Sequence, residues 1–63
     1  MKVGSLVRVK STSTGDNKWV VKLYRERTPV LLLKHDTPWG MVLHESRHKY
    51  IYLRQLEVVS ESQ

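Results

Sequence analysis

Closely spaced turn signals divide this chain into short stretches of β-forming residues, and this pattern limits the fold more than any other feature. Five or six runs rich in Val, Leu, Ile and aromatic residues are separated by turns that contain Gly, Pro, Asn or clustered charges. No window of about ten residues shows the 3.6-residue apolar spacing of a helix. The pattern predicts an all-β domain of five or six short antiparallel strands that can close into a small barrel. The expected strands cover residues 6–10, 18–24, 30–35, 39–44, 50–53 and 56–59, with a 3₁₀ turn at residues 53–56.

The chain has 63 residues, which is room for one domain and no more. We expect the barrel to span residues 1–59 and residues 60–63 to form a frayed C-terminal tail. A chain this short buries only about 60% of the surface it exposes when unfolded, so its stability depends on efficient packing or on a partner that covers apolar surface. There is no cysteine, which excludes disulfides and thiolate metal sites.

Positive charge is concentrated in the first half of the chain. Residues 1–34 carry eight Lys or Arg and two acidic residues, a net charge of +6, and residues 35–63 carry three Lys or Arg and four acidic residues, a net charge of −1. The sum is +5. A basic half can attract nucleic acid or an acidic protein surface, and it can equally keep a small domain soluble.

A basic surface follows from the predicted strand 18–24. If Trp19, Val21 and Leu23 point inward, the alternate residues of this strand point outward beside the basic residues of the first strand. Cations interleaved with an aromatic ring can follow a phosphate backbone and stack a base. Polar residues also alternate on any half-solvated antiparallel sheet, so a nucleic-acid face, a protein-docking face and a solvated face all remain open. The candidate nucleic-acid-binding residues are Arg8, Lys10, Lys18, Lys22, Tyr24, Arg25 and Arg27.

The sequence also contains more large apolar side chains than a small barrel can enclose. The expected interior consists of Val7, Val9, Val21, Leu23, Leu33, Val42, Ile51, Leu53, Leu56 and Val58. Which faces of the strands 30–35 and 39–44 are buried is left open. In either case several large apolar groups reach the surface, where Trp and Tyr often anchor contacts with a partner. The candidate protein-interface residues are Val30, Leu32, Trp39, Met41, Tyr50 and Tyr52.

Catalytic motifs are not found. No serine lies at a strand-to-helix elbow, and Gly4, Gly15 and Gly40 are too scattered to form a phosphate loop. His35 and His44 could approach each other across a strand pair, but we interpret them as solvent-facing residues at strand ends. A barrel this small is filled by its own side chains. We therefore expect no enzyme activity, no cofactor and no metal.

The chain has no candidate membrane segment. Its longest apolar run, residues 30–33, is far shorter than the roughly 20 residues that a bilayer span needs. The first residues lack the apolar core of a signal peptide. We expect a soluble cytoplasmic protein, complete as written, that does not associate with membranes.

Three segments are similar to the framing strands of SH3-like barrels. Residues 2–10 resemble the opening G-D-x-V-x strand, although Ser5 stands where Asp is usual, residues 39–43 resemble the G-x-V-L strand, and residues 53–59 resemble the closing turn and last strand. Similar short proteins, mostly uncharacterised, are encoded by tailed bacteriophages. The resemblance implies an SH3-like barrel that acts as a phage-type accessory protein in the host cytoplasm. It would dock on another protein or on itself, with nucleic-acid binding as the alternative.

One enzyme family shares this frame. Plasmid-type dihydrofolate reductases are tetramers of SH3-like barrels whose active-site strand carries a Val-Gln-Ile-Tyr motif. The matching residues here are Lys49, Tyr50, Ile51 and Tyr52, so the first two positions differ, and Lys49 would bring a charge into the pore. An oligomeric pore enzyme is therefore a remote alternative, and it would require binding of a reduced nicotinamide cofactor.

Overall fold

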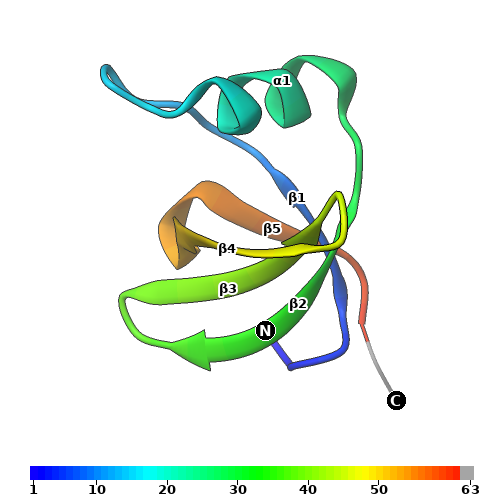
Figure 1. The fold of residues 1–63 in the computed structure, drawn as a ribbon. Coiled ribbons are helices and arrows are strands. Elements are labelled where there is room, and N and C mark those ends of the chain that lie inside the picture. Colours follow the sequence, from blue (N-terminus) through cyan, green and yellow to red (C-terminus); the bar gives the residue numbers. More distant parts are fainter. Residues whose placement is uncertain (62–63) are drawn as a thin grey trace.

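Within residues 1–61, five antiparallel strands form one sheet in the order β4-β3-β2-β1-β5, with one α-helix between β1 and β2 (Figure 1). The structure is a computed structural model and describes residues 1–61. The prediction of a mainly β fold with antiparallel strands is confirmed. The elements are β1 (Leu6–Val9), α1 (Lys18–Glu26), β2 (Val30–Asp36), β3 (Trp39–His44), β4 (Arg47–Tyr52), the 3₁₀ helix η1 (Leu53–Gln55) and β5 (Leu56–Ser60).

The segment 18–24 is a helix, so its assignment as a strand is wrong. The amides of Val20 and Val21 donate to the carbonyl oxygen of Asn17 at the start of α1. At its end Arg27 adopts the left-handed conformation, with φ 53°, and its N–H donates to the carbonyl oxygen of Leu23. Helical geometry buries Val20 and Leu23, which are three residues apart, whereas the strand interpretation buried every second residue. The helix has only nine residues, and in so short a segment the apolar residues fit both the two-residue period of a strand and the 3.6-residue period of a helix.

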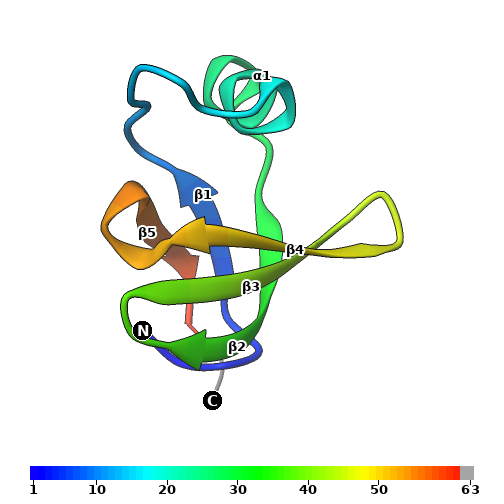
Figure 2. The same cartoon turned by 60° about the vertical axis from the view of Figure 1, so that its left-hand side comes forward.

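The β3–β4 hairpin is tighter than expected. Glu45 and Ser46 both have positive φ, 51° and 62°, which is the conformation of a two-residue type I′ turn. The strands pair from His44 opposite Arg47 to Trp39 opposite Tyr52. β4 therefore begins at Arg47, three residues before the start of the expected strand 50–53. The turn of this hairpin extends away from the rest of the sheet (Figure 2).

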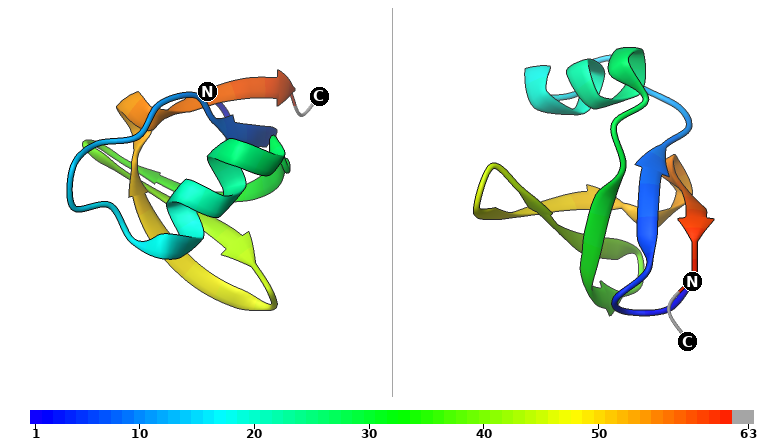
Figure 3. Two further views of the ribbon diagram at one scale, coloured as in Figure 1. Left: turned by 90° about the horizontal axis from the view of Figure 1, so that it is seen from above. Right: turned by 90° about the vertical axis from the view of Figure 1, so that its right-hand side faces the viewer.

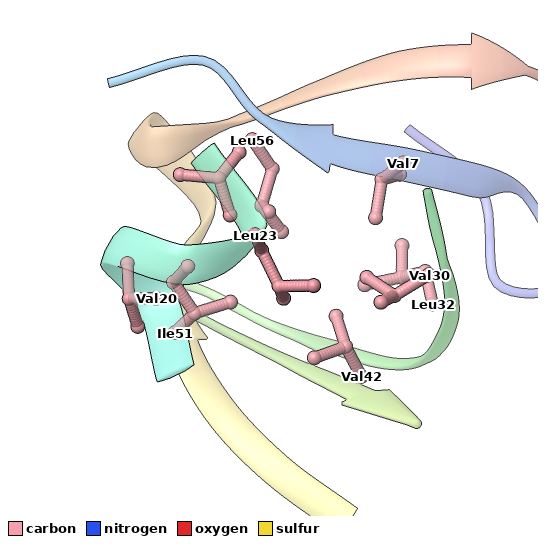
Figure 4. Close-up of a cluster of buried hydrophobic side chains, with 9 residues drawn as sticks. Val7, Val20, Leu23, Val30, Leu32, Val42, Ile51 and Leu56 are labelled. Atoms are coloured by element: carbon pink, nitrogen blue, oxygen red, sulfur yellow. The ribbon is translucent and has the colours of Figure 1, made fainter. Parts of the chain in front are cut away.

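The core lies between the concave side of the sheet and α1, which crosses one end of the curled sheet (Figures 3 and 4). Val30 and Leu32 point into this core, and this settles which face of β2 is buried. The predicted core residues Val21, Leu33 and Val58 are half-buried or exposed instead, and Leu53 packs against the core while partly buried. The buried apolar residues are Val7, Val9, Val20, Leu23, Val30, Leu32, Val42, Ile51 and Leu56.

Gly40 is required by close packing and is not the site of a bulge. A Cβ atom at Gly40 would lie 2.8 Å from Leu53 Cδ2 and 3.3 Å from Leu32 Cδ1. The irregularities in strand pairing lie elsewhere, in β2 between Leu32 and Lys34 and in β1 at the step from Leu6. Gly40 therefore lets η1 pack closely under β3.

The first and last strands lie side by side, because β1 pairs with β5 as well as with β2. β5 extends through Ser60, the first residue of the expected tail. Residues 62–63 of that tail lie outside the described residues.

Candidate functional site

Five of the seven candidate nucleic-acid-binding residues line a single cavity of about 350 Å³. They come from β1 and the residue after it, from the last turn of α1, and from the C-cap of that helix. We call this cavity the basic cleft. Val9 and Glu57 complete its lining, and its candidate residues are Arg8, Lys10, Tyr24, Arg25 and Arg27.

The basic cleft carries four basic side chains and one carboxylate, a net charge of +3 from these residues. Arg8 and Glu57 pair across the β1–β5 ladder, and Arg8 Nε donates to Glu57 Oε1 at 2.5 Å. Within residues 1–61, Lys10, Arg25 and Arg27 form no ion pair. Tyr24 is 44% exposed. The cleft therefore offers uncompensated positive charge next to an accessible aromatic ring.

Lys18 and Lys22 do not join the basic cleft. They line a separate hollow of about 530 Å³ with Asp16, Val21 and Glu26, and Arg25 borders both hollows. Positions 18, 22 and 25 are four and three residues apart and share one helix face, so Arg25 borders both hollows, whereas Lys18 and Lys22 lie too far toward the start of α1 to line the basic cleft. The continuous basic sheet face expected from the sequence is therefore wrong, because it required residues 18–24 to form a strand.

Of the six candidate interface residues, four lie on the convex side of the sheet and two do not. Val30 and Leu32 are only 6% and 0% exposed, so they belong to the core and not to a surface. The convex side also carries exposed apolar residues outside the six candidates, among them Leu6 and Leu43, which are 40% and 37% exposed. We call this surface the outer apolar face. Its members are Leu6, Leu31, Trp39, Met41, Leu43, Tyr50 and Tyr52.

Strand register brings the aromatic residues of the outer apolar face together. Trp39 pairs with Tyr52, and their rings stack with centroids 4.2 Å apart at an angle of 20°. The guanidinium of Arg54 lies 4.6 Å from the centroid of the Tyr52 ring. Tyr50 is 56% exposed and lines a shallow hollow with Trp39. The result is an accessible aromatic cluster on a hydrogen-bonded hairpin.

The long polar loop before α1 is attached to the end of this cluster. Gln55, only 4% exposed, donates from Nε2 to Asp16 Oδ2 at 2.9 Å and to the Ser11 carbonyl oxygen at 3.4 Å. Asp16 Oδ2 also accepts from the Ser13 amide at 2.6 Å. Together with the aromatic residues, Asp16 and Gln55 border a smaller hollow of about 200 Å³. Neither was identified as a site residue from the sequence.

His44 takes part in contacts between the hairpin and the helix. Its ring stacks on Trp19 at a centroid distance of 5.7 Å, and Lys49 Nζ lies 2.9 Å from His44 Nδ1 and 5.0 Å from the Trp19 ring centroid. Lys49, the first position of the segment compared with the reductase motif, thus contacts α1. No group of three His, Asp or Glu side chains able to hold a metal ion occurs in the described part of the chain.

Among residues 1–61 no helix has the length and apolar character needed to cross a bilayer. No protein-family model, curated protein or solved structure matches the chain.

Proposed function

We propose that this protein is a non-catalytic binding module that docks on another protein through its outer apolar face. The observation that carries the proposal is the grouping of Trp39, Tyr50 and Tyr52, which are 40%, 56% and 36% exposed, on adjacent positions of one hairpin. Exposed aromatic residues in one patch are a common mark of a protein interface. Trp and Tyr are also the residues that most often dominate binding energy.

The construction of this face favours tight docking. Its aromatic side chains stand on strands paired over their whole length, and the Trp39–Tyr52 stack restricts both rings before a partner arrives. Side chains that are already ordered lose little conformational entropy on binding. A large apolar area is therefore offered at a low ordering cost.

The charges around the outer apolar face define the partner's chemistry. Lys34 pairs with Met41 and Arg54 lies on Tyr52, whereas Asp36 supplies the acidic group opposite Trp39. A partner with an apolar centre and carboxylates at its rim fits this pattern. A second copy of this chain would bring two positive rims together at a net charge of +5 each. We therefore assign the face to a different, acidic protein.

An SH3-like barrel is the fold that we infer for this module. The 3₁₀ helix η1 between β4 and β5 and the pairing of β1 with β5 support that interpretation. The similarity of residues 2–10, 39–43 and 53–59 to small barrels of tailed bacteriophages makes an accessory or assembly role the favoured setting.

Selection from a displayed random-peptide library tests the docking proposal. We expect the enriched peptides to combine aromatic or aliphatic residues with Asp or Glu. Their affinity should fall about 30-fold or more on Tyr50→Ala, since loss of a dominant contact costs about 2 kcal/mol or more. Lys22→Ala, an exposed change on α1, is the matched control and should leave affinity unchanged.

Three results would count against this function. Peptides that bind Tyr50→Ala as well as the wild type would remove the outer apolar face from the proposal. Sedimentation showing a dimer that Tyr50→Ala dissociates would make a second copy the occupant. Binding of a reduced nicotinamide cofactor would favour the reductase-like alternative.

A further inference from the structure

We propose that the basic cleft is a second binding site, separate from the outer apolar face, and that it takes single-stranded nucleic acid. Arg8, Lys10, Arg25 and Arg27 contact the phosphates, and Tyr24 stacks on a base. This site goes beyond the proposed docking function and does not depend on it.

The charge balance of the cleft leaves it ready for an anionic ligand. Its single carboxylate, on Glu57, already accepts from Arg8 Nε, and Lys10, Arg25 and Arg27 form no ion pair among residues 1–61. A phosphate that enters therefore does not have to displace an internal partner from these three cations. Charge-assisted contacts of this kind supply most of the affinity for a nucleic-acid backbone.

The dipole of α1 alone does not explain why the four basic side chains of the cleft lie together. Arg25 and Arg27 lie at the C-terminal end of α1, where basic residues complement the negative end of the helix dipole. Arg8 lies in β1 and Lys10 directly after it, where no helix dipole accounts for their positive charge. Their convergence with the helix end on one cavity is the observation that points to a ligand.

Glu57 orients one of the phosphate-binding groups. Its carboxylate accepts from Arg8 Nε, so the two terminal amino groups of that guanidinium remain without a partner in the part of the chain that the structure describes. A guanidinium held at one edge can present its free N–H groups to phosphate with less loss of freedom.

The shape and the aromatic ring favour a single strand over a duplex. The cleft is a cavity of about 350 Å³ with Tyr24, 44% exposed, in its wall. Duplex bases are stacked on each other and cannot lie against a ring inside a cavity. The unpaired bases of a single strand can, and each stacked base contributes a sequence-tolerant contact.

Fluorescence anisotropy with a labelled single-stranded DNA of about ten nucleotides and mixed sequence tests the site. Four phosphate contacts predict a slope of about −2.8 in log affinity against log salt, which is a loss of roughly 50-fold between 50 and 200 mM salt. The double change Arg25→Ala/Arg27→Ala should weaken binding by about tenfold or more.

Lys18→Ala/Lys22→Ala is the matched control. It removes the same charge from exposed positions of the same helix, outside the basic cleft, and should weaken binding by less than about threefold. Tyr24→Ala should weaken binding by about tenfold, and Tyr24→Phe, which keeps the ring, should restore it. Circular dichroism melting of each variant checks that these exposed changes leave the fold intact.

The outcomes separate this site from general attraction to a basic protein. Equal losses in the two double variants, or no binding at 50 mM salt, would overturn the proposal. A duplex of the same length that binds as tightly, or Tyr24→Ala with unchanged affinity, would overturn the assignment to a single strand. Inorganic polyphosphate that competes fully at matched phosphate concentration would show that the cleft recognises phosphate alone.

Discussion

The basic cleft and the outer apolar face differ in how the chain assembles them. The aromatic part of the outer apolar face belongs to one hairpin, whose strands are joined by a two-residue turn. The basic cleft draws on β1, α1 and β5, and its ion pair joins residues 49 positions apart in the chain. The aromatic part of the outer apolar face therefore depends on the hairpin alone, whereas the cleft exists only while α1 stays docked on the sheet.

The two surfaces also differ in the interactions they offer. The cleft presents long cationic side chains, which attract a ligand from a distance and lose rotamer freedom when they bind. The outer apolar face presents stacked rings, whose contribution depends on buried area and not on ionic strength. One small domain can thus carry an electrostatic site and an apolar site that respond to different conditions.

The largest expected effect comes from detaching the helix. Leu23 is 3% exposed and lies in the core, so Leu23→Ala should cost about 2–5 kcal/mol of stability in urea unfolding. Amides of α1 should lose protection from hydrogen exchange before those of β3. Val21→Ala, on a half-buried position of the same helix, should cost clearly less. Equal losses for the two changes would contradict the observed helix packing.

Salt should separate the two binding activities. Between 50 and 200 mM salt, oligonucleotide affinity should fall roughly 50-fold, and affinity for a peptide selected on the outer apolar face should fall much less. Isothermal titration at both concentrations measures the two affinities. Parallel losses would show that one electrostatic surface serves both ligands.

A change at Gly40 should affect the hairpin more than the cleft. The added Cβ of Gly40→Ala would press on Leu53 and Leu32, at a cost of about 1–3 kcal/mol in thermal or urea unfolding. Because Trp39 directly precedes Gly40 in β3, the peptide affinity of the outer apolar face should fall as well. Oligonucleotide affinity under folded conditions should remain within about threefold of the wild type. A stronger loss there would mean that the two surfaces are coupled.

The smallest effect is expected for the Arg8–Glu57 ion pair. The side chains of Arg8 and Glu57 are 41% and 40% exposed, and ion pairs in contact with solvent contribute little to stability. A double-mutant cycle of Arg8→Ala and Glu57→Ala should therefore give a coupling energy below about 1 kcal/mol. A larger coupling would assign this pair a structural role in holding β1 to β5. The measurement is chemical denaturation of the four variants.

The sequence predicted the strands better than the helix. β3 was predicted with its observed bounds because Pro38 precedes it and charged turn residues follow it. The helix was missed because a short apolar run fits both the strand and the helix period. Two signals could have identified it, Asn17 as a helix-starting residue and Pro29 two residues beyond the C-cap.

The outer apolar face could be predicted from the sequence more fully than the basic cleft could. Strand alternation correctly placed Tyr50 and Tyr52 on the surface, but it left open which face of the strand that begins at Trp39 is buried. It could not show that Val30 and Leu32 face inward, because the apolar run in β2 has no polar face to mark its outside. Which basic residues gather in the cleft depends on how α1 docks against β1, a long-range contact that no local pattern encodes.

Chemical-shift mapping of the ¹⁵N-labelled protein with the single-stranded DNA tests the separation of the two surfaces most directly. We predict that the amides of Arg8, Lys10 and residues 24–27 shift on titration while those of Trp39, Tyr50 and Tyr52 stay in place. Shifts concentrated on the three aromatic residues, with the cleft unaffected, would contradict the assignment of nucleic acid to the cleft.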